Sequence, residues 1–341
     1  MGAMGKAVQF TLFAESRSIL RCTRCRASLD EVAEAFVCTQ CGSRFPLVRG
    51  VYRFAEGQGY AASFGWQWRR YSRTQLDTTG SISDEDFRKR TGIAPEELRG
   101  KLVLDVGCGM GRFAEVATRW GAQVVGVDLS DSCEVAAENL RKREFIAIQA
   151  DVMNLPFAPN AFDFIYSIGV LHHTPDCEKS FKSLPQYLKR GGTITVWLYS
   201  GYNKWYRFSD LYRKITRRMP LRLLHSILKV AVPFFYSLDR ILRTIPVIGR
   251  RIAGLVHYVF PVNLNPNPTI RLLDTFDWYS PEYQSKHTYE EVFRWFESCG
   301  LEALTVGELT LSVRGRKPAA SNSAFAELEL KKSADCEMPT A

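Results

Sequence analysis

The sequence lacks three features that would assign it to a special class of protein. Its N-terminus has no charged segment followed by an apolar one, so we expect no secretory signal peptide. Its longest uncharged run, residues 253–270, contains three asparagines and three prolines, so it could not satisfy its backbone as a helix inside a bilayer, and no transmembrane segment is predicted. No internal repeat is present, which excludes a repeat array. These absences leave an ordinary globular chain.

Acidic residues are scarce in one segment. The whole chain of 341 residues is 46% hydrophobic, enough for a sizeable core, and carries a formal charge of +9. Residues 201–260 contain 12 Lys or Arg and only 2 Asp, a balance of +10, so the rest of the chain is close to neutral. The basic character therefore belongs to this segment.

Nine cysteines are present, and four of them form two Cys-x-x-Cys pairs separated by 12 residues. Two such pairs offer four thiolates to a tetrahedral Zn²⁺, whereas a redox dithiol would need only one pair on a thioredoxin-like unit. Four thiolates leave no open position for water, so we predict a structural zinc site and a reducing, cytoplasmic location. The predicted ligands are Cys22, Cys25, Cys38 and Cys41.

The sequence around these cysteines continues with Gly42-x-x-Phe45-Pro46 and then Gly50-Val-x-Arg53-Phe54. It resembles the short Trm-type zinc ribbons that accompany or activate tRNA and protein methyltransferases. Because the only core we expect in so short a segment is the metal, we predict a separate zinc-ribbon module.

Strand-length apolar runs alternate with helical periods from residue 101 onward, which predicts repeated β-α winding and a parallel sheet. The pattern stops after residue 199 and resumes at Thr288, where Thr288-x-x-Glu291 predicts a capping box before a helix that ends at Gly300. Two short strands, 303–306 and 309–313, follow it. The earlier runs are 101–106, 123–129, 145–150, 162–168 and 192–199, with helices at 112–120, 131–141 and 178–188.

A glycine-rich turn follows the first of these strands, in the sequence Asp105-Val-Gly107-Cys-Gly109-Met-Gly111. Glycines let backbone amides approach a ligand where a strand turns into a helix. The spacing differs from a dinucleotide fingerprint because Arg112 stands where the third glycine would be, and Asp105 would repel a pyrophosphate but not a sulfonium.

Two more acidic residues end predicted strands. Asp128 can accept both hydroxyls of a ribose, a feature that NAD sites share. Asp151, with the next backbone amide, can read an adenine amino group and ring nitrogen; a plain helix N-cap is the alternative.

Together with residues 162–173, FDFIYSIGVLHH, these positions resemble the class I S-adenosylmethionine-dependent methyltransferases, particularly the small-molecule, type 11-like group that includes quinone-biosynthesis enzymes. The resemblance covers about residues 102–199. It implies an α/β, Rossmann-like, seven-stranded and mostly parallel sheet, with one of the last two strands antiparallel. It also implies S-adenosylmethionine as cofactor, S-adenosylhomocysteine as product, and a binding site made by Asp105, Gly107, Gly109, Asp128, Leu129, Asp151, Val152 and Ser167.

The acceptor side of this site is expected after the fourth strand, where the transferable methyl group should point. His173 is the candidate base, because a neutral imidazole could take a proton from an attacking hydroxyl or amine; packing without catalysis is the alternative. Transfer without a base is also open, since alignment alone contributes up to ~7 to 11 kcal/mol. The predicted substrate-binding residues, each with core packing as its alternative, are Phe64, Trp68, Tyr71, His172, Tyr199, Trp278, Tyr279, Tyr283 and His287.

These features predict seven segments along the chain. They are a tag remnant and flexible start (1–18), the zinc ribbon (19–56), aromatic-rich linker helices (57–96), the methyltransferase core (97–200), a basic helical insertion (201–286), the end of the core (287–316) and a disordered tail (317–341). Within the insertion, amphipathic stretches at 211–232 and 238–256 could form a specificity lid, lie on an anionic membrane, or simply pack with a solvated face.

The leading functional prediction is methylation of a small or lipid-like metabolite by in-line transfer, in the cytoplasm and peripheral to the membrane. One alternative is an RNA base methyltransferase that binds RNA through its ribbon, although the Asn-Pro-Pro-Tyr element is missing after position 167. Another is a non-catalytic methyltransferase-like scaffold. The acceptor, the atom methylated and the oligomeric state stay open.

Overall fold

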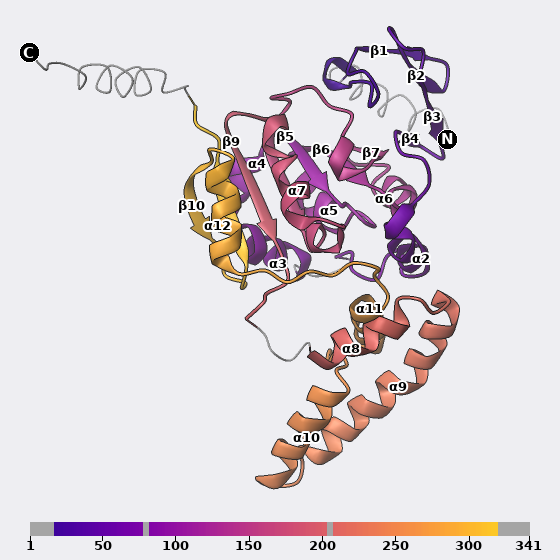
Figure 1. The fold of residues 1–341 in the computed structure, drawn as a ribbon, viewed down its shortest axis with the longest axis vertical. Coiled ribbons are helices and arrows are strands. Elements are labelled where there is room, and N and C mark those ends of the chain that lie inside the picture. Colours follow the sequence, from indigo (N-terminus) through magenta and orange to yellow (C-terminus); the bar gives the residue numbers. More distant parts are fainter. Residues whose placement is uncertain (1–16, 78–81, 203–206, 320–341) are drawn as a thin grey trace, which may run out of the picture.

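One sheet of eleven strands runs through residues 17–77, 82–202 and 207–319, the parts of the chain that this computed structural model describes (Figure 1). Its strand order is β1-β2-β3-β4-β7-β6-β5-β8-β9-β11-β10. The strands are β1 (Leu29–Val32), β2 (Ala35–Cys38), β3 (Arg44–Val48), β4 (Val51–Arg53), β5 (Leu102–Val106), β6 (Gln123–Asp128), β7 (Phe145–Gln149), β8 (Phe162–Ile168), β9 (Leu188–Trp197), β10 (Glu302–Val306) and β11 (Ser312–Arg316).

The central strands β7, β6, β5, β8 and β9 are parallel neighbours, as the alternation of strand and helix predicts. All five residues of β7 are buried, because helices cover parallel strands on both faces. The connecting helices are α5 (Arg112–Arg119), α6 (Ser132–Asn139) and α7 (Cys177–Lys182), and β11 closes the sheet antiparallel to β9. The mostly parallel α/β sheet is thus confirmed.

The expectation of seven strands is wrong, and so is that of a separate ribbon. β4 pairs in parallel with β7, with Tyr52 opposite Ile148, so the four N-terminal strands extend the central sheet. The side chains of Phe36 and Phe45 are buried in the same hydrophobic cluster as Ile148. The N-terminal β module therefore has an apolar core that it shares with the rest of the protein.

Two boundaries differ from the sequence patterns, one at the end of α7 and one at the start of β11. α7 ends at Lys182 and not at residue 188, because Pro185 cannot continue a helix; the short helix η5 (Pro185–Tyr187) leads directly into β9. β11 begins at Ser312 and not at residue 309, because Leu311 takes a left-handed turn conformation with φ 65°. The capping box is present: α12 (Tyr289–Ser298) follows Thr288, whose hydroxyl accepts from the Glu291 amide.

Short helices lie between the β module and β5. They are η2 (Gly59–Ala61), α2 (Ala62–Arg70), α3 (Ile82–Thr91) and α4 (Pro95–Leu98). α2 packs on α6 and α3 packs on α5, so these helices cover the sheet beside the glycine-rich turn.

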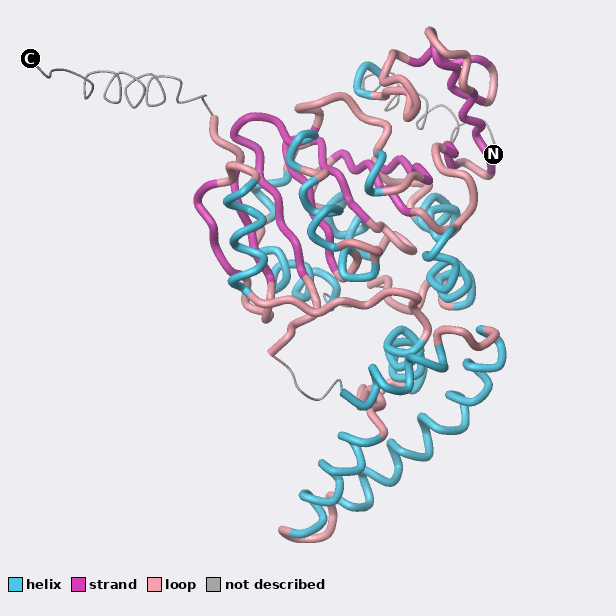
Figure 2. The backbone as a smooth tube through the Cα atoms, viewed as in Figure 1, coloured by secondary structure: helices cyan, strands magenta, loops and turns pink. Residues whose placement is uncertain are grey.

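Four helices lie in the described residues of the insertion, 201–202 and 207–286: α8 (Arg207–Thr216), α9 (Leu221–Leu242), α10 (Ile248–Val259) and α11 (Pro268–Tyr279). α9 and α10 form a long hairpin, here called the helical arm (residues 221–260), which projects away from the sheet (Figures 1 and 2). The amphipathic stretches 211–232 and 238–256 do not correspond to two single helices, since α9 runs through Pro233 from Leu221 to Leu242. α11 lies between the arm and the sheet (Figure 1).

α9 is also long and apolar enough to cross a membrane, judged by length and composition alone. The sequence prediction of no such segment rested on the longest uncharged run and overlooked this helix, which has four charged residues in 22. The arm's core packs Leu224, Leu228 and Val232 of α9 against Phe276 and Tyr279 of α11.

Phe36→Ala tests whether the N-terminal β module folds with the sheet. We expect the mutation to destabilise the protein by about 3 to 5 kcal/mol, because a fully buried ring is lost from the shared cluster. All seven tryptophans lie outside residues 19–56, so tryptophan fluorescence during urea unfolding reports on the remainder of the protein. Its midpoint should fall in Phe36→Ala and stay unchanged in the exposed control Val48→Ala; an unchanged midpoint in both would mean an independent module.

Candidate functional site

A cavity of about 780 Å³ opens at the edge of the sheet where the parallel strands end. Val106 of β5, Asp128 of β6, Ile168 of β8 and Trp197 of β9 all line it. Ligands of open α/β sheets bind at this edge, and the volume is typical of a small-molecule site. Side chains of α2 and α11 form the opposite wall, so the insertion contributes directly to the cavity.

The glycine-rich turn forms the floor of the cavity between β5 and α5. Gly107 and Gly109 have φ angles of 81° and 52°, in the left-handed region. A Cβ on Gly107 would lie 2.3 Å from the side chain of Val170, so no larger residue fits there. The backbone of this turn is therefore open to a ligand at the N-terminus of α5.

Asp128 is held rigidly beside this turn. One carboxylate oxygen accepts from the Gly109 amide at 3.0 Å, and the other accepts from the amide and hydroxyl of Ser130 at 2.8 and 2.7 Å. Burial raises its pKa, while these hydrogen bonds oppose that shift. Leu129 and Val152, two other residues predicted to bind the cofactor, also line the cavity.

Three other predicted cofactor residues do not line the cavity. Asp105 is buried behind the turn, and burial raises its pKa to about 8. The Ser167 hydroxyl donates to the carbonyl of Val106 at 3.0 Å and so ties β8 to β5. Asp151 is the N-cap of the short helix η3 (Val152–Asn154) and accepts from the Met153 amide at 2.9 Å, which is the structural alternative considered for it.

His173 lines the same cavity as Asp128 and is only 4% exposed. Its Nδ1–H donates to the carbonyl of Tyr283 at 2.9 Å, which leaves the lone pair on Nε2 without a partner among the described residues. Burial lowers its pKa to about 4, so the ring is neutral at pH 7. His173 therefore has a neutral ring whose acceptor nitrogen is buried in the wall of the cavity and has no partner among the described residues.

His172 points away from the cavity. Its Nδ1 accepts from the Tyr199 amide at 3.3 Å, its ring stacks on Tyr199 with centroids 3.9 Å apart, and burial lowers its pKa well below the usual value. His287 lies in a separate hollow, where it bonds the Ser285 hydroxyl at 2.7 Å and Glu291 at 3.3 Å. Both histidines therefore make structural contacts: His172 packs against Tyr199, and His287 forms hydrogen bonds at the start of α12.

The predicted aromatic residues divide into two groups. Phe64, Trp68, Tyr199 and Trp278 line the cavity. The others pack outside it: Tyr71 bonds His225 of α9 at 2.8 Å, Tyr279 donates to the Pro261 carbonyl at 2.8 Å, and Tyr283 packs its ring edge-on against Tyr60.

Two carboxyl groups in the cavity escaped the sequence analysis. Asp274 and Asp277 lie three residues apart on α11, hence on one face of that helix. Burial raises the pKa of Asp277 to about 7 and that of Asp274 to about 6. The spacing of the two aspartates in the sequence indicates that they share a helix face. They were overlooked because the segment around them shows no alternation of strands and helices. Other overlooked lining residues are Tyr60, Gln67, Arg90, Arg112, Trp197, Ser200, Tyr202, Asn263, Leu309 and Thr310.

Two hydrogen-bond donors contact the carboxylate of Asp277. It accepts from the Gln67 amide at 3.4 Å and from the Tyr199 hydroxyl at 3.3 Å, both long contacts. The Gln67 carbonyl oxygen is buried and has no partner among the described residues. Asp277, Gln67 and His173 thus bring several acceptor atoms to the wall of the cavity, two of them buried and without a partner among the described residues.

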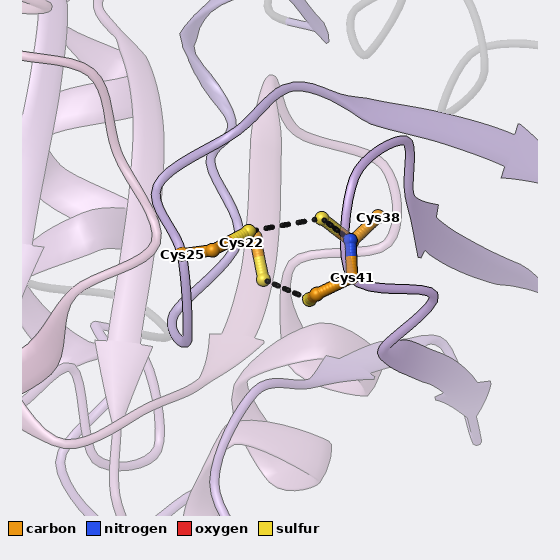
Figure 3. Close-up of side chains that lie close together, drawn as sticks. All are labelled: Cys22, Cys25, Cys38 and Cys41. Atoms are coloured by element: carbon orange, nitrogen blue, oxygen red, sulfur yellow. Dashed lines mark hydrogen bonds between the residues drawn. The ribbon is translucent and has the colours of Figure 1, made fainter.

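The four paired cysteines come together at the tip of the N-terminal β module (Figure 3). Their sulfur atoms all lie within 4.8 Å of one another, with Cys22 to Cys41 at 3.6 Å and Cys25 to Cys38 at 3.3 Å. Backbone amides point at the sulfurs of Cys22 and Cys38 at 3.4 Å. Four converging sulfurs at these distances fit one tetrahedral metal ion.

Comparison with known sequences identifies part of the chain. Residues 104–196 match the family described as "Methyltransferase domain". A sterol 24-C-methyltransferase of Saccharomyces cerevisiae is 33% identical over 185 residues, which are 52% of this chain and 46% of that enzyme. One of Kluyveromyces lactis is 26% identical over 298 residues, which are 84% of this chain and 73% of that enzyme. The chain therefore spans less than half the length of the S. cerevisiae relative.

Among solved structures, a putative S-adenosyl-L-methionine-dependent methyltransferase from Methanococcus maripaludis is similar to this chain. It is 17% identical, with a TM-score of 0.41, and the superposition covers 78% of this chain and 97% of that one. The matched segment, residues 104–196, runs from β5 to β9 and contributes the glycine-rich turn, Asp128 and His173 to the cavity. Residues 104–196 thus match a methyltransferase domain, and the cavity lies at the carboxyl edge of the strands in this segment.

Proposed function

We propose that the protein is an S-adenosylmethionine-dependent methyltransferase that acts on an apolar, lipid-like acceptor. One observation carries the proposal: a single cavity connects the glycine-rich turn and Asp128 with an aromatic half that contains His173 and Asp277. The similarity to sterol 24-C-methyltransferases supports the class of acceptor.

The cofactor half of the cavity fits a nucleoside with a cationic methyl donor. Asp128 lies where a carboxylate can accept from the ribose hydroxyls, and the open backbone at Gly107 and Gly109 allows close approach. S-adenosylmethionine supplies the electrophilic methyl group there. The neighbouring Trp68 ring, whose Nε1 would lie 3.1 Å from a Cβ on Gly109, favours a cation by its negative face.

The acceptor half combines aromatic walls with the acceptor atoms of Asp277, Gln67 and His173. A buried acceptor atom without a partner costs about 1 to 3 kcal/mol, which a bound donor group would recover. The fitting acceptor is therefore an apolar molecule with a hydroxyl or an amino group. His173 accepts the hydrogen bond or the proton of that group through Nε2, and in-line alignment supplies most of the rate.

We further propose that the cysteine cluster holds one structural Zn²⁺. The sulfur separations support this, because zinc–sulfur bonds of about 2.3 Å place tetrahedral thiolates slightly less than 4 Å apart. A thiolate site of this kind is expected in the reducing cytoplasm, which is where we place the protein.

The acceptor class is tested by methyl transfer from radiolabelled S-adenosylmethionine to fractions of a cell extract. We expect label in the chloroform-soluble fraction, dependent on the enzyme. Label in the RNA fraction alone would contradict the proposal and favour the RNA base methyltransferase, and absence of any label with intact cofactor binding would favour the non-catalytic scaffold.

Asp128→Ala should weaken S-adenosylmethionine binding by about 10- to 150-fold. The loss of a charged acceptor for the ribose hydroxyls is worth roughly 1.5 to 3 kcal/mol. Isothermal titration calorimetry measures the affinity, with Glu138→Ala on the exposed end of α6 as a control that should bind normally. Equal affinity in both variants would remove Asp128 from the cofactor site.

His173→Ala should lower turnover by about 10²-fold and leave cofactor affinity intact. Because burial holds the pKa of His173 near 4, its neutral form persists between pH 5 and 8, and the rate should decline from this group only as the pH falls through about 4. Single-turnover rates on the lipid fraction across pH measure both effects. A near-normal rate in the variant would show that His173 only packs.

Metal analysis should find about one zinc per chain. Thiolates must lose their protons to bind, so a chelator or acid should release the metal and destabilise residues 19–56. Cys38→Ser should lower the zinc content, whereas Cys177→Ser, which removes a buried cysteine far from the cluster, should not. Zinc-free protein with the four cysteines paired as disulfides would contradict the site.

A further inference from the structure

The arm exposes a continuous apolar stripe along α9. Leu223, Ile227, Val230, Phe234 and Ile241 are all exposed, with Val230 at 74% and Phe234 at 61%. Their spacings of four, three, four and seven residues place them on one line along a helix with 3.6 residues per turn. The buried residues of α9 lie on another face, so this stripe is additional to the apolar face that packs on α11.

The tip of the arm and α10 also expose apolar side chains. Ile245 and Val247 in the tip are exposed, Val247 at 71%, and Ile248, Ile252 and Leu255 of α10 repeat the helical spacing. An apolar surface of this length is rare on a protein that stays free in water and marks an interaction surface.

Positive charge flanks the stripe. The arm has six Lys or Arg and one acidic residue, Asp239, which is paired with Arg243 at 2.7 Å. Arg222, Lys229 and Arg240 lie about 100° from the stripe around α9, so they form a basic edge along one side of it. These three and the exposed Arg250 and Arg251 of α10 have no carboxylate partner among the described residues.

We propose that the helical arm docks on an anionic lipid bilayer, with the apolar stripe among the headgroups and the basic edge against lipid phosphates. Apolar and basic residues in adjacent stripes are the pattern of a helix that lies in the interface. A protein partner would need an apolar surface for the stripe and, beside it, acidic groups for the basic edge. An anionic bilayer offers both, because its acyl chains are apolar and its headgroups are negatively charged.

The geometry points to docking on the bilayer, and not to crossing it. α10 has 12 residues and is about 18 Å long, too short to return across a hydrocarbon core of about 30 Å. One face of α9 is also buried against α11, which carries Asp274 and Asp277 in the cavity. If the proposed function holds, docking brings the acceptor half of the cavity close to the lipids.

Vesicle co-sedimentation of the full chain tests the docking without cofactor or methyl transfer, so its outcome is independent of the proposed enzymatic function. We expect binding to vesicles of phosphatidylcholine with phosphatidylglycerol, little binding to phosphatidylcholine alone, and weaker binding as salt is raised above about 0.1 M. No binding to the anionic vesicles at low salt would overturn the proposal.

Two pairs of variants locate the surface. Val230→Glu should weaken vesicle binding by about tenfold or more, whereas Ile82→Glu, a change at an equally exposed position on α3, should not. The double variant Lys229→Gln and Arg240→Gln should weaken it by about 25-fold, roughly fivefold per residue, against no change for Arg141→Gln and Lys142→Gln. Circular dichroism verifies that each variant folds.

Two results would exclude docking by the arm. Equal loss in Val230→Glu and Ile82→Glu would mean that vesicle binding does not use the stripe. Unchanged vesicle binding in Val230→Glu, with a dimer becoming a monomer in light scattering, would show that the stripe is an interface between two copies of the chain.

Discussion

The hydrogen bond from the Gly109 amide to Asp128 is the contact on which the site depends. It joins the turn after β5 to the end of β6, and so fixes the two strands at the edge where the cavity opens. The amides of Gly107 and Cys108 both donate to the Val127 carbonyl, which holds the same turn from the other direction. Because Asp128 is buried, its charge favours a cation or a donor group above the turn.

The sequence predicted the parts of the fold that depend on local pattern. Strand-length apolar runs and helical periods placed β5 to β9 within a few residues, because these strands are buried on both faces and their helices are amphipathic. The joining of β4 to β7 could not be read in the same way, since pairing between strands almost a hundred residues apart leaves no local signature. The two Cys-x-x-Cys pairs predicted the ribbon, but the sequence did not reveal the apolar core that the ribbon shares with the sheet.

The candidate site shows the same division between local and long-range information. The glycine-rich turn and Asp128 both line the cavity. Their positions could be predicted from the sequence because strand ends and glycine conformations are local properties. Ser167 does not, because successive residues of a strand face opposite sides and its hydroxyl bonds β5. Asp274 and Asp277 went unnoticed because their role depends on how α11 packs on the sheet, which no spacing in the insertion reveals.

α11 connects the two ends of the molecule through opposite faces of one helix. Phe276 and Tyr279 pack into the arm's core with Leu224 and Leu228, while Asp277 reaches the cavity and bonds Tyr199. α11 therefore carries, next to the arm's core, a carboxyl group whose pKa burial raises to about 7. Since a carboxylate is stabilised by a nearby positive charge, a cationic donor bound in the cavity would favour the ionised form of this group.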